Sequence, residues 1–90
     1  MGMDKELRQH RDAIDAIDDE MLKLINDRAR HAQTIGAIKG GGLVYRPERE
    51  AQILRRVKEN NPGPLSGESV AKLFREIMSA CLALEKPLKV

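Results

Sequence analysis

The feature that most constrains the fold is a helical pattern that continues without a break from about Asp4 to Lys39. Gly36 is the only glycine or proline within this stretch, and these two residues are the ones that most disfavour a helix interior. At ~1.5 Å per residue, a helix of about 36 residues is roughly 54 Å long, whereas a compact chain of this size has a diameter of roughly 30 Å. The helix is therefore longer than the domain that contains it.

Apolar residues recur along this helix at a seven-residue repeat, and they form two neighbouring rows. The rows read Leu7, Ile14, Met21, Arg28, Ile35 and His10, Ile17, Leu24, His31, Ile38. An apolar stripe that runs beyond the compact part of the chain needs cover from another chain, most simply a two-fold partner. We therefore expect an intertwined homodimer.

The remainder of the chain predicts two shorter helices, so the expected class is all-α, one domain over residues 1–90. The run Gly40-Gly41-Gly42 ends the first helix. The residues around this run lack the motif of a phosphate-binding loop. Pro47 suits the first position of a helix that continues to about Asn60. The break at residues 60–64 is followed by Ser66, a good N-cap for a helix that continues to about Lys86 and stops before Pro87.

Composition excludes several classes of function. Sixteen basic and fourteen acidic residues give a net charge of +2, without the concentrated basic stripe of a nucleic-acid binder. No apolar stretch is long enough for a membrane span. Cys81 is the only cysteine, which fits a reducing, cytoplasmic setting. We expect Cys81 to be a core residue, because free cysteines are commonly buried.

Charged residues occupy positions on the predicted apolar faces. Arg28 interrupts the first row of the long helix, and Lys39, eleven residues later, lies over the same face about 16 Å along the axis. Glu50 shares the stripe of the second helix with its apolar residues Ile53, Leu54 and Val57, and Arg49 lies close to it. The third helix has an apolar face on which Glu85 also lies: Val70, Leu73, Phe74, Ile77, Cys81 and Leu84.

These inward charges have two interpretations. Each alone is explained by an ion pair near a helix end, or by a long side chain that extends to water. Together they favour an anion site, since the cations outnumber the two carboxylates. A small molecule with carboxylates and hydroxyl or ether oxygens would suit arginine, lysine and glutamate. His10 and His31 have no metal-ligand spacing, and no nucleophile has an adjacent base, so we expect neither a metal nor a cofactor.

The spaced polar residues also resemble a known family, the all-helical chorismate mutases, over about residues 5 to 86. The matching pattern comprises Arg11, Ile14, Asp18, Arg28, Gly36, Lys39, Arg49-Glu50, Leu73-Phe74 and Glu85. The closing segment from Leu84 resembles the junction to a prephenate dehydratase domain in bifunctional proteins. The resemblance therefore implies that residues 87–90 begin a linker to a following domain.

The resemblance implies the Claisen rearrangement of chorismate to prephenate, an isomerase step of aromatic amino acid and phenylalanine biosynthesis in the shikimate pathway. It implies that Arg28 and Arg11 of the partner subunit hold the two carboxylates, with support from Arg49. Lys39 and Glu85 would bond the ether oxygen, and Glu50 would receive the ring hydroxyl.

Three positions depart from some family members. Glu85 replaces a glutamine, and only the protonated acid can donate to the ether oxygen. We therefore expect a raised pKa for Glu85, with activity falling as pH rises through it. Cys81, which the resemblance places among the substrate-binding residues, replaces a serine that contacts a carboxylate, and Arg46 replaces an aspartate.

Two alternative functions remain open at this level. One is an isochorismate pyruvate lyase, which resembles the mutases and uses a similar cationic pocket. The other is a helical dimerisation module without catalysis. Assays with chorismate and isochorismate distinguish the mutase, the lyase and the dimerisation module.

Overall fold

The computed structural model describes residues 2–39 and 46–85, and within these ranges every regular element is an α-helix. Helix α1 comprises Gly2–Lys39, α2 comprises Pro47–Asn60 and α3 comprises Gly67–Glu85. The predicted order of long, short and medium helices is confirmed, with α1 beginning two residues earlier than expected. The glycine run at 40–42 lies outside the described residues.

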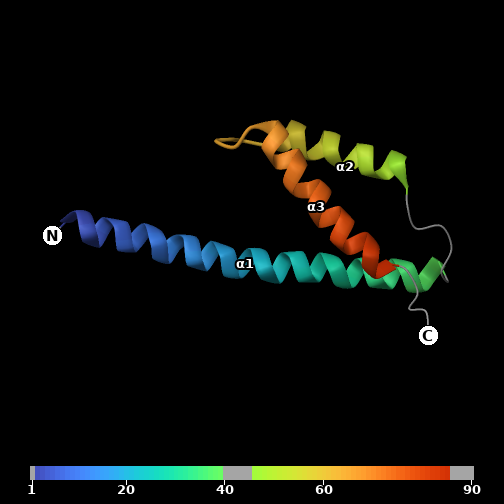
Figure 1. Cartoon of the computed structure of the whole chain (residues 1–90), viewed down its shortest axis with the longest axis horizontal. Helices are drawn as coiled ribbons and strands as arrows, with labels where there is room; N and C mark the ends of the chain where they lie inside the picture. Colours follow the sequence, from blue (N-terminus) through green and yellow to red (C-terminus); the bar gives the residue numbers. More distant parts are fainter. Residues whose placement is uncertain (1, 40–45, 86–90) are drawn as a thin grey trace.

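The chain has an elongated shape rather than a compact one. Its principal extents are 59 × 31 × 16 Å, and its radius of gyration is 17.3 Å, against about 12 Å for a compact chain of this length. In Figure 1, α3 crosses from the end of α2 to the C-terminal half of α1, while the N-terminal half of α1 extends beyond both other helices. The predicted overhang of the first helix is confirmed.

The helix ends follow from local sequence. Pro47 occupies the first turn of α2, and the backbone N–H of Glu50 donates to the Arg46 carbonyl over 3.0 Å. Glu48 and Glu50 lie in this first turn, where carboxylates favour the positive end of the helix dipole. At the start of α3, the Ser66 hydroxyl accepts from the Ser69 N–H at 3.1 Å. Ser66 is therefore the N-cap that the sequence predicts.

The loop between α2 and α3 is closed by the side chain of Asn61. Its amide Nδ2 donates to the Leu65 carbonyl at 2.7 Å, and its Oδ1 accepts from the Gly63 N–H at 3.2 Å. Gly63 has a φ of 77°, which glycine adopts without a steric cost. These bonds direct the chain back, so that α3 packs against α2.

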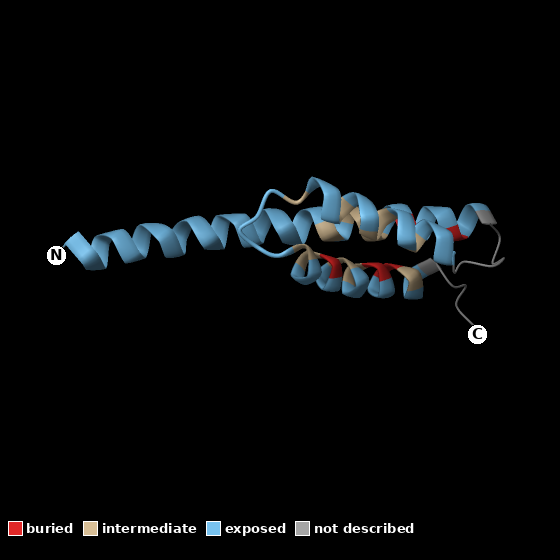
Figure 2. Cartoon of the chain, turned by 90° about the horizontal axis from the view of Figure 1, so that it is seen from above, coloured by how far each residue is buried: buried red, intermediate tan, exposed pale blue. Residues whose placement is uncertain are grey.

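The contact between α1 and α3 uses small residues of α1 rather than the two predicted rows. Ala32 and Gly36 are buried, and Ile25 and Ala29 are half-buried. Their spacing of four, three and four residues is that of one helix face. Small side chains such as those of Ala32 and Gly36 let a neighbouring helix approach closely. Figure 2 shows the buried and half-buried positions confined to the C-terminal half of α1.

The predicted rows of α1 are exposed within the single chain. The exposed large apolar residues of α1 are Met3, Leu7, Ile14, Ile17, Met21, Leu22, Leu24, Ile35 and Ile38. Ile14 is 56% and Leu24 63% exposed. The hydrophobic period identified apolar positions correctly, but this chain alone does not bury them.

The predicted core of α2 and α3 is confirmed only in part. Cys81 is buried as expected, while Ile53, Leu54 and Val57 are half-buried. Leu73 and Leu84, which we assigned to the apolar face of the third helix, are exposed, so that assignment was wrong for the single chain. Ala71 and Met78 are buried with Cys81 instead. Val70, Phe74 and Ile77 of the predicted face are half-buried as expected, so the face that α3 turns toward its neighbours is only shifted toward Ala71 and Met78.

Candidate active site

A cavity of about 320 Å³ lies between α1 and α2 and is bounded on one side by α3. Its lining residues come from all three helices: Arg28, Arg49, Ile53, Arg56, Val57, Asn60 and Phe74. Three of them carry guanidinium groups and none of them carries a carboxylate. The walls are apolar where Ile53, Val57 and Phe74 lie, so the cavity combines positive charge with an apolar surface.

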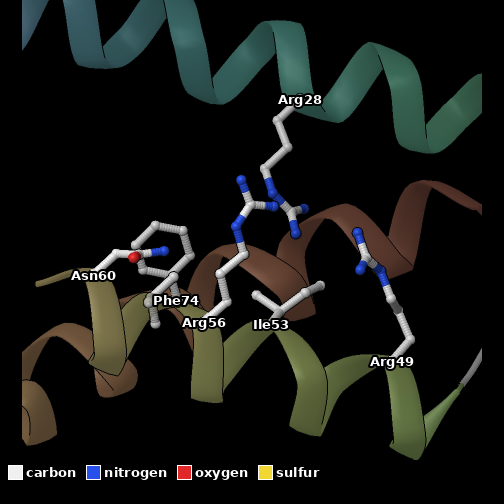
Figure 3. Close-up of a pocket in the computed structure, with 7 residues that line it drawn as sticks. Arg28, Arg49, Ile53, Arg56, Asn60 and Phe74 are labelled. Atoms are coloured by element: carbon white, nitrogen blue, oxygen red, sulfur yellow. The ribbon is translucent and has the colours of Figure 1, made fainter.

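Arg28 is the cation that the sequence places on an apolar row, and the structure brings it into this cavity. It is half-buried on α1 and its side chain extends toward α2 (Figure 3). Ile25 and Ala29, on either side of it, are half-buried as well. Because the neighbouring positions pack toward α3, the Arg28 side chain leaves α1 beside this contact and enters the space in front of α2.

Arg49 also lines the cavity, as its predicted position close to the stripe of the second helix indicated. It is exposed, and its guanidinium donates to the Gln52 side-chain oxygen at 2.8 Å, one turn later on α2. This bond orients the arginine along the helix surface. In Figure 3 the guanidinium of Arg49 points into the same space as that of Arg28.

Arg56 is a lining residue that lies outside the site residues predicted from the sequence. The face of α2 that borders the cavity is Arg49, Ile53, Arg56, Val57 and Asn60. Its spacing of four, three, one and three residues is the repeat of one helical face. Extending the face from Arg49 through Ile53 would have identified Arg56. The apolar pattern instead predicts an inward stripe of Glu50, Ile53, Leu54 and Val57.

The other expected site residues are placed differently. Glu50 is half-buried on α2 but does not line the cavity, and Cys81 is buried in α3 and is not a lining residue either. Arg11 is exposed on the overhanging half of α1. The backbones of Lys39 and Glu85 end α1 and α3, while their side chains lie outside the described residues.

The geometry is suited to binding an anion with an apolar body. Guanidinium groups bind carboxylates through paired, charge-assisted hydrogen bonds. The half-buried position of Arg28 and the apolar walls reduce the screening by water that weakens such bonds at a protein surface. A three-helix chain with an overhanging first helix and an arginine-lined cavity thus defines a small all-helical protein with a cationic pocket.

Comparisons with known proteins agree with this description. Residues 10–86 match the family model described as chorismate mutase type II. The chain is 59% identical over 88 residues to a bifunctional chorismate mutase/prephenate dehydratase of Neisseria gonorrhoeae, covering 98% of this chain and 24% of that protein. A Pseudomonas aeruginosa protein of the same description is 50% identical over 97 residues, covering 100% of this chain and 27% of the relative. The chain therefore spans about a quarter of the length of these relatives.

Solved structures share the fold over most of their length. A chorismate mutase of Thermus thermophilus superimposes with a TM-score of 0.85 at 36% identity, covering 89% of this chain and 93% of that one. A Helicobacter pylori chorismate mutase, solved in complex with prephenate, has a TM-score of 0.81 at 30% identity, with 88% of each chain covered. This chain belongs to the chorismate mutase type II family.

None of the three helices in the described part of the chain combines the length and the apolar composition needed to span a bilayer.

Proposed function

We propose that this chain converts chorismate to prephenate in a pocket that a second copy of the chain completes. The observation that carries the proposal is the convergence of Arg28 and Arg49, from different helices, on one cavity whose lining residues include no carboxylate. Chorismate is a dicarboxylate with a carbocyclic body, and it supplies the missing anionic groups. The Helicobacter pylori relative, whose structure contains prephenate, supports the same ligand class.

The reaction needs no group beyond those that position and polarise the substrate. It is an isomerisation in which the ether C–O bond breaks while a new C–C bond forms within the same molecule. Negative charge grows on the ether oxygen in the transition state. Donors aimed at that oxygen lower the barrier, each by about 3–4 kcal/mol on the scale of an oxyanion-hole donor. Holding the two reacting ends together lowers it further by positioning.

The proposed roles of the residues follow from this charge distribution. Arg28 and Arg11 of the partner subunit bind the two carboxylates, and Arg49 supports the carboxylate end. Lys39 and Glu85 act on the ether oxygen, and Glu50 accepts the hydrogen bond of the ring hydroxyl. We keep Cys81 as a substrate-binding candidate by resemblance alone, because it is 3% exposed and outside the lining set.

The homodimer is supported by the apolar surface that the chain leaves uncovered. The N-terminal half of α1 is exposed throughout, including Ile14, Ile17 and Met21, each at least 50% exposed. A contiguous apolar stripe of this length is typical of an interface. Two α1 helices that cross in an antiparallel arrangement would cover each other's stripe and create a two-fold interface.

The same arrangement explains how Arg11 can reach a site centred on Arg28. The two residues are seventeen positions apart, about 26 Å along the axis and about 100° around it, so they do not share a site within one chain. An antiparallel crossing near residues 19 and 20 places Arg11 of the partner subunit level with Arg28. It also places Ile14 level with the partner's Ile25, so that two apolar residues lie at the same height in the interface.

The proposed setting is the cytoplasm. Its support is the single cysteine, which is buried as a free thiol in α3. Disulfide-free chains with a reduced cysteine are typical of reducing compartments.

The experiment that tests the proposed function is an assay of the purified chain with chorismate. Loss of chorismate is followed together with acid conversion of the product, prephenate, to phenylpyruvate. Arg28→Ala should lower kcat/KM by roughly 10- to 150-fold, the equivalent of a charge-assisted bond of about 1.5–3 kcal/mol. Arg30→Ala is the matched control on α1, because Arg30 is exposed and pairs with Asp27. A folded dimer that leaves chorismate unchanged between pH 5 and 8 would overturn the proposal.

Isochorismate in the same assay separates the mutase from a pyruvate lyase. Release of pyruvate from isochorismate, without prephenate formation from chorismate, would establish the lyase. A chain that dimerises but acts on neither substrate would be a dimerisation module, and Arg28→Ala would then change nothing measurable.

A further inference from the structure

Arg56 lies in the cavity without a role in the set that the resemblance implies. It follows Arg49 by seven residues, which is two turns and about 10.5 Å along α2, with Ile53 between them on the same face. Figure 3 shows its side chain extending from α2 toward the guanidinium of Arg28. The two arginines belong to different helices, so only the tertiary structure brings them to one cavity.

Three cations of the described part contact other side chains, and Arg28 and Arg56 are not among them. Arg30 pairs with Asp27, Lys58 pairs with Glu68 across α2 and α3 at 3.4 Å, and Arg49 donates to Gln52. Within the described side chains, Arg28 and Arg56 have no ion pair and no side-chain hydrogen bond. Two like charges in one cavity repel each other. Arg56 is exposed and Arg28 is half-buried, so water screens part of this repulsion, and the apolar walls of Ile53, Val57 and Phe74 limit that screening.

An anion between these two guanidinium groups removes the repulsion and gives both a partner. We propose that Arg56 is a further substrate-binding residue, which acts together with Arg28 on one carboxylate of the substrate. This inference rests on the proposed function, since it assigns a place in that same site. Two guanidinium groups bound to one carboxylate also restrict its orientation more than a single guanidinium group does.

The role predicts a particular kinetic effect. The carboxylate keeps its charge throughout the rearrangement, whereas the ether oxygen gains charge only in the transition state. A residue that binds the carboxylate therefore stabilises substrate and transition state about equally. Removing such uniform binding raises KM and leaves kcat unchanged.

The test compares Arg56→Ala and Arg56→Lys with Arg55→Ala, measuring kcat and KM for chorismate together with the dimer dissociation constant. Arg55 is the matched control, because it is an exposed arginine of α2 like Arg56 but does not line the cavity. Arg56→Ala should raise KM roughly tenfold or more, as expected for the loss of one charge-assisted bond, with kcat nearly unchanged. Arg56→Lys should recover part of the loss, and Arg55→Ala should behave as the wild type.

Two results would overturn the assignment while leaving the proposed function in place. One is an unchanged KM in Arg56→Ala when Arg28→Ala has lost activity. The other is a weakened dimer with normal KM at protein concentrations that restore the dimer, which would make Arg56 a subunit contact.

If the folded wild-type dimer does not turn over chorismate, the proposed function fails and the Arg56 inference is judged by binding alone. Calorimetric titration of wild type and Arg56→Ala with prephenate then decides it. Weaker binding to the variant supports the inference, and equal dissociation constants, or no binding to either protein, overturn it.

Discussion

Arg28 on α1 and Arg56 on α2 line the same cavity, although no Cα atom of α1 lies within 8 Å of one of α2 in the described part of the chain. The link between them is α3, which packs against both helices and contributes Phe74 to the cavity wall. Long arginine side chains span the remaining gap. The position of the charges thus depends on how α3 holds the other two helices apart.

Mixing two variants of low activity tests whether each site is shared between subunits. Arg11→Ala and Arg28→Ala should each be poorly active alone, because every site of either homodimer lacks one carboxylate-binding arginine. In a heterodimer of the two, one site has lost both arginines and the other is intact. Random exchange makes half of the dimers mixed, so activity should return to about a quarter of the wild-type value.

The measurement is chorismate turnover after the two variants are unfolded together and refolded, compared with each refolded separately. A mixture no more active than its components would show that Arg11 and Arg28 serve the same site of one chain, or that Arg11 serves none.

A charge on the exposed stripe of α1 should break the dimer. Ile14 is 56% exposed in the single chain, and burying an isoleucine at an interface contributes about 1.5–3 kcal/mol on each side. Because the two-fold axis repeats the change, Ile14→Glu should destabilise the dimer by about 3 kcal/mol or more. Analytical ultracentrifugation over a range of concentrations measures the shift to monomer.

Lys23→Glu is the control for this change. Lys23 is exposed on the opposite face of α1 and receives the same new side chain. It should dissociate as the wild type does. Equal effects of the two substitutions would place the interface on another face of the helix.

The acid form of Glu85 is tested by the pH dependence of activity. The role that resemblance gives this residue requires a proton on its carboxyl, so activity should fall as rising pH removes that proton. An amide donates at every pH, so Glu85→Gln should keep its activity at high pH and show a flatter profile of kcat against pH. Loss of activity at all pH values in this variant would contradict the role.

The N-cap of α3 should contribute measurably to stability. Ser66 accepts a hydrogen bond from the Ser69 N–H at 3.1 Å, and removing such a cap costs about 1 kcal/mol. Urea unfolding of Ser66→Ala at a constant protein concentration should show a free energy of unfolding lower by this amount. Ser79→Ala is the control, since Ser79 is exposed in the interior of α3, and its stability should match or slightly exceed that of the wild type.

The helices themselves could be predicted because the signals that start and stop them are local. Pro47 and Ser66 mark the starts of α2 and α3 at the residues the structure shows, and the break at residues 60–64 separates the two helices. The overhang of α1 followed from its length alone. Arg28 was identified as a site residue because a charge on an apolar row is visible without knowing what packs against it.

The helix faces that pack against neighbours could not be predicted as accurately as the helix ends. An amphipathic helix shows which residues avoid water but not which neighbour covers them. Leu73 and Leu84 are apolar and exposed, whereas Ala32 and Gly36 are small and buried. Helix packing depends on how closely two backbones can approach, and small residues permit the closest approach. The sequence rows on α1 therefore describe a surface left open in this chain, and the contact with α3 uses another face.

The amino-acid sequence by itself determined the number, order and ends of the helices, the surplus length of the first helix and the place of Arg28 in an apolar row. Each of these depends on interactions between residues within a few turns of one another. Only the tertiary structure decided that Arg56 joins Arg28 and Arg49 around one cavity, and that Ala32 and Gly36 are buried on α1, whose neighbour in the described part of the chain is α3. The physical reason is that these relations join separate helices, whose relative rotation is set by side-chain packing.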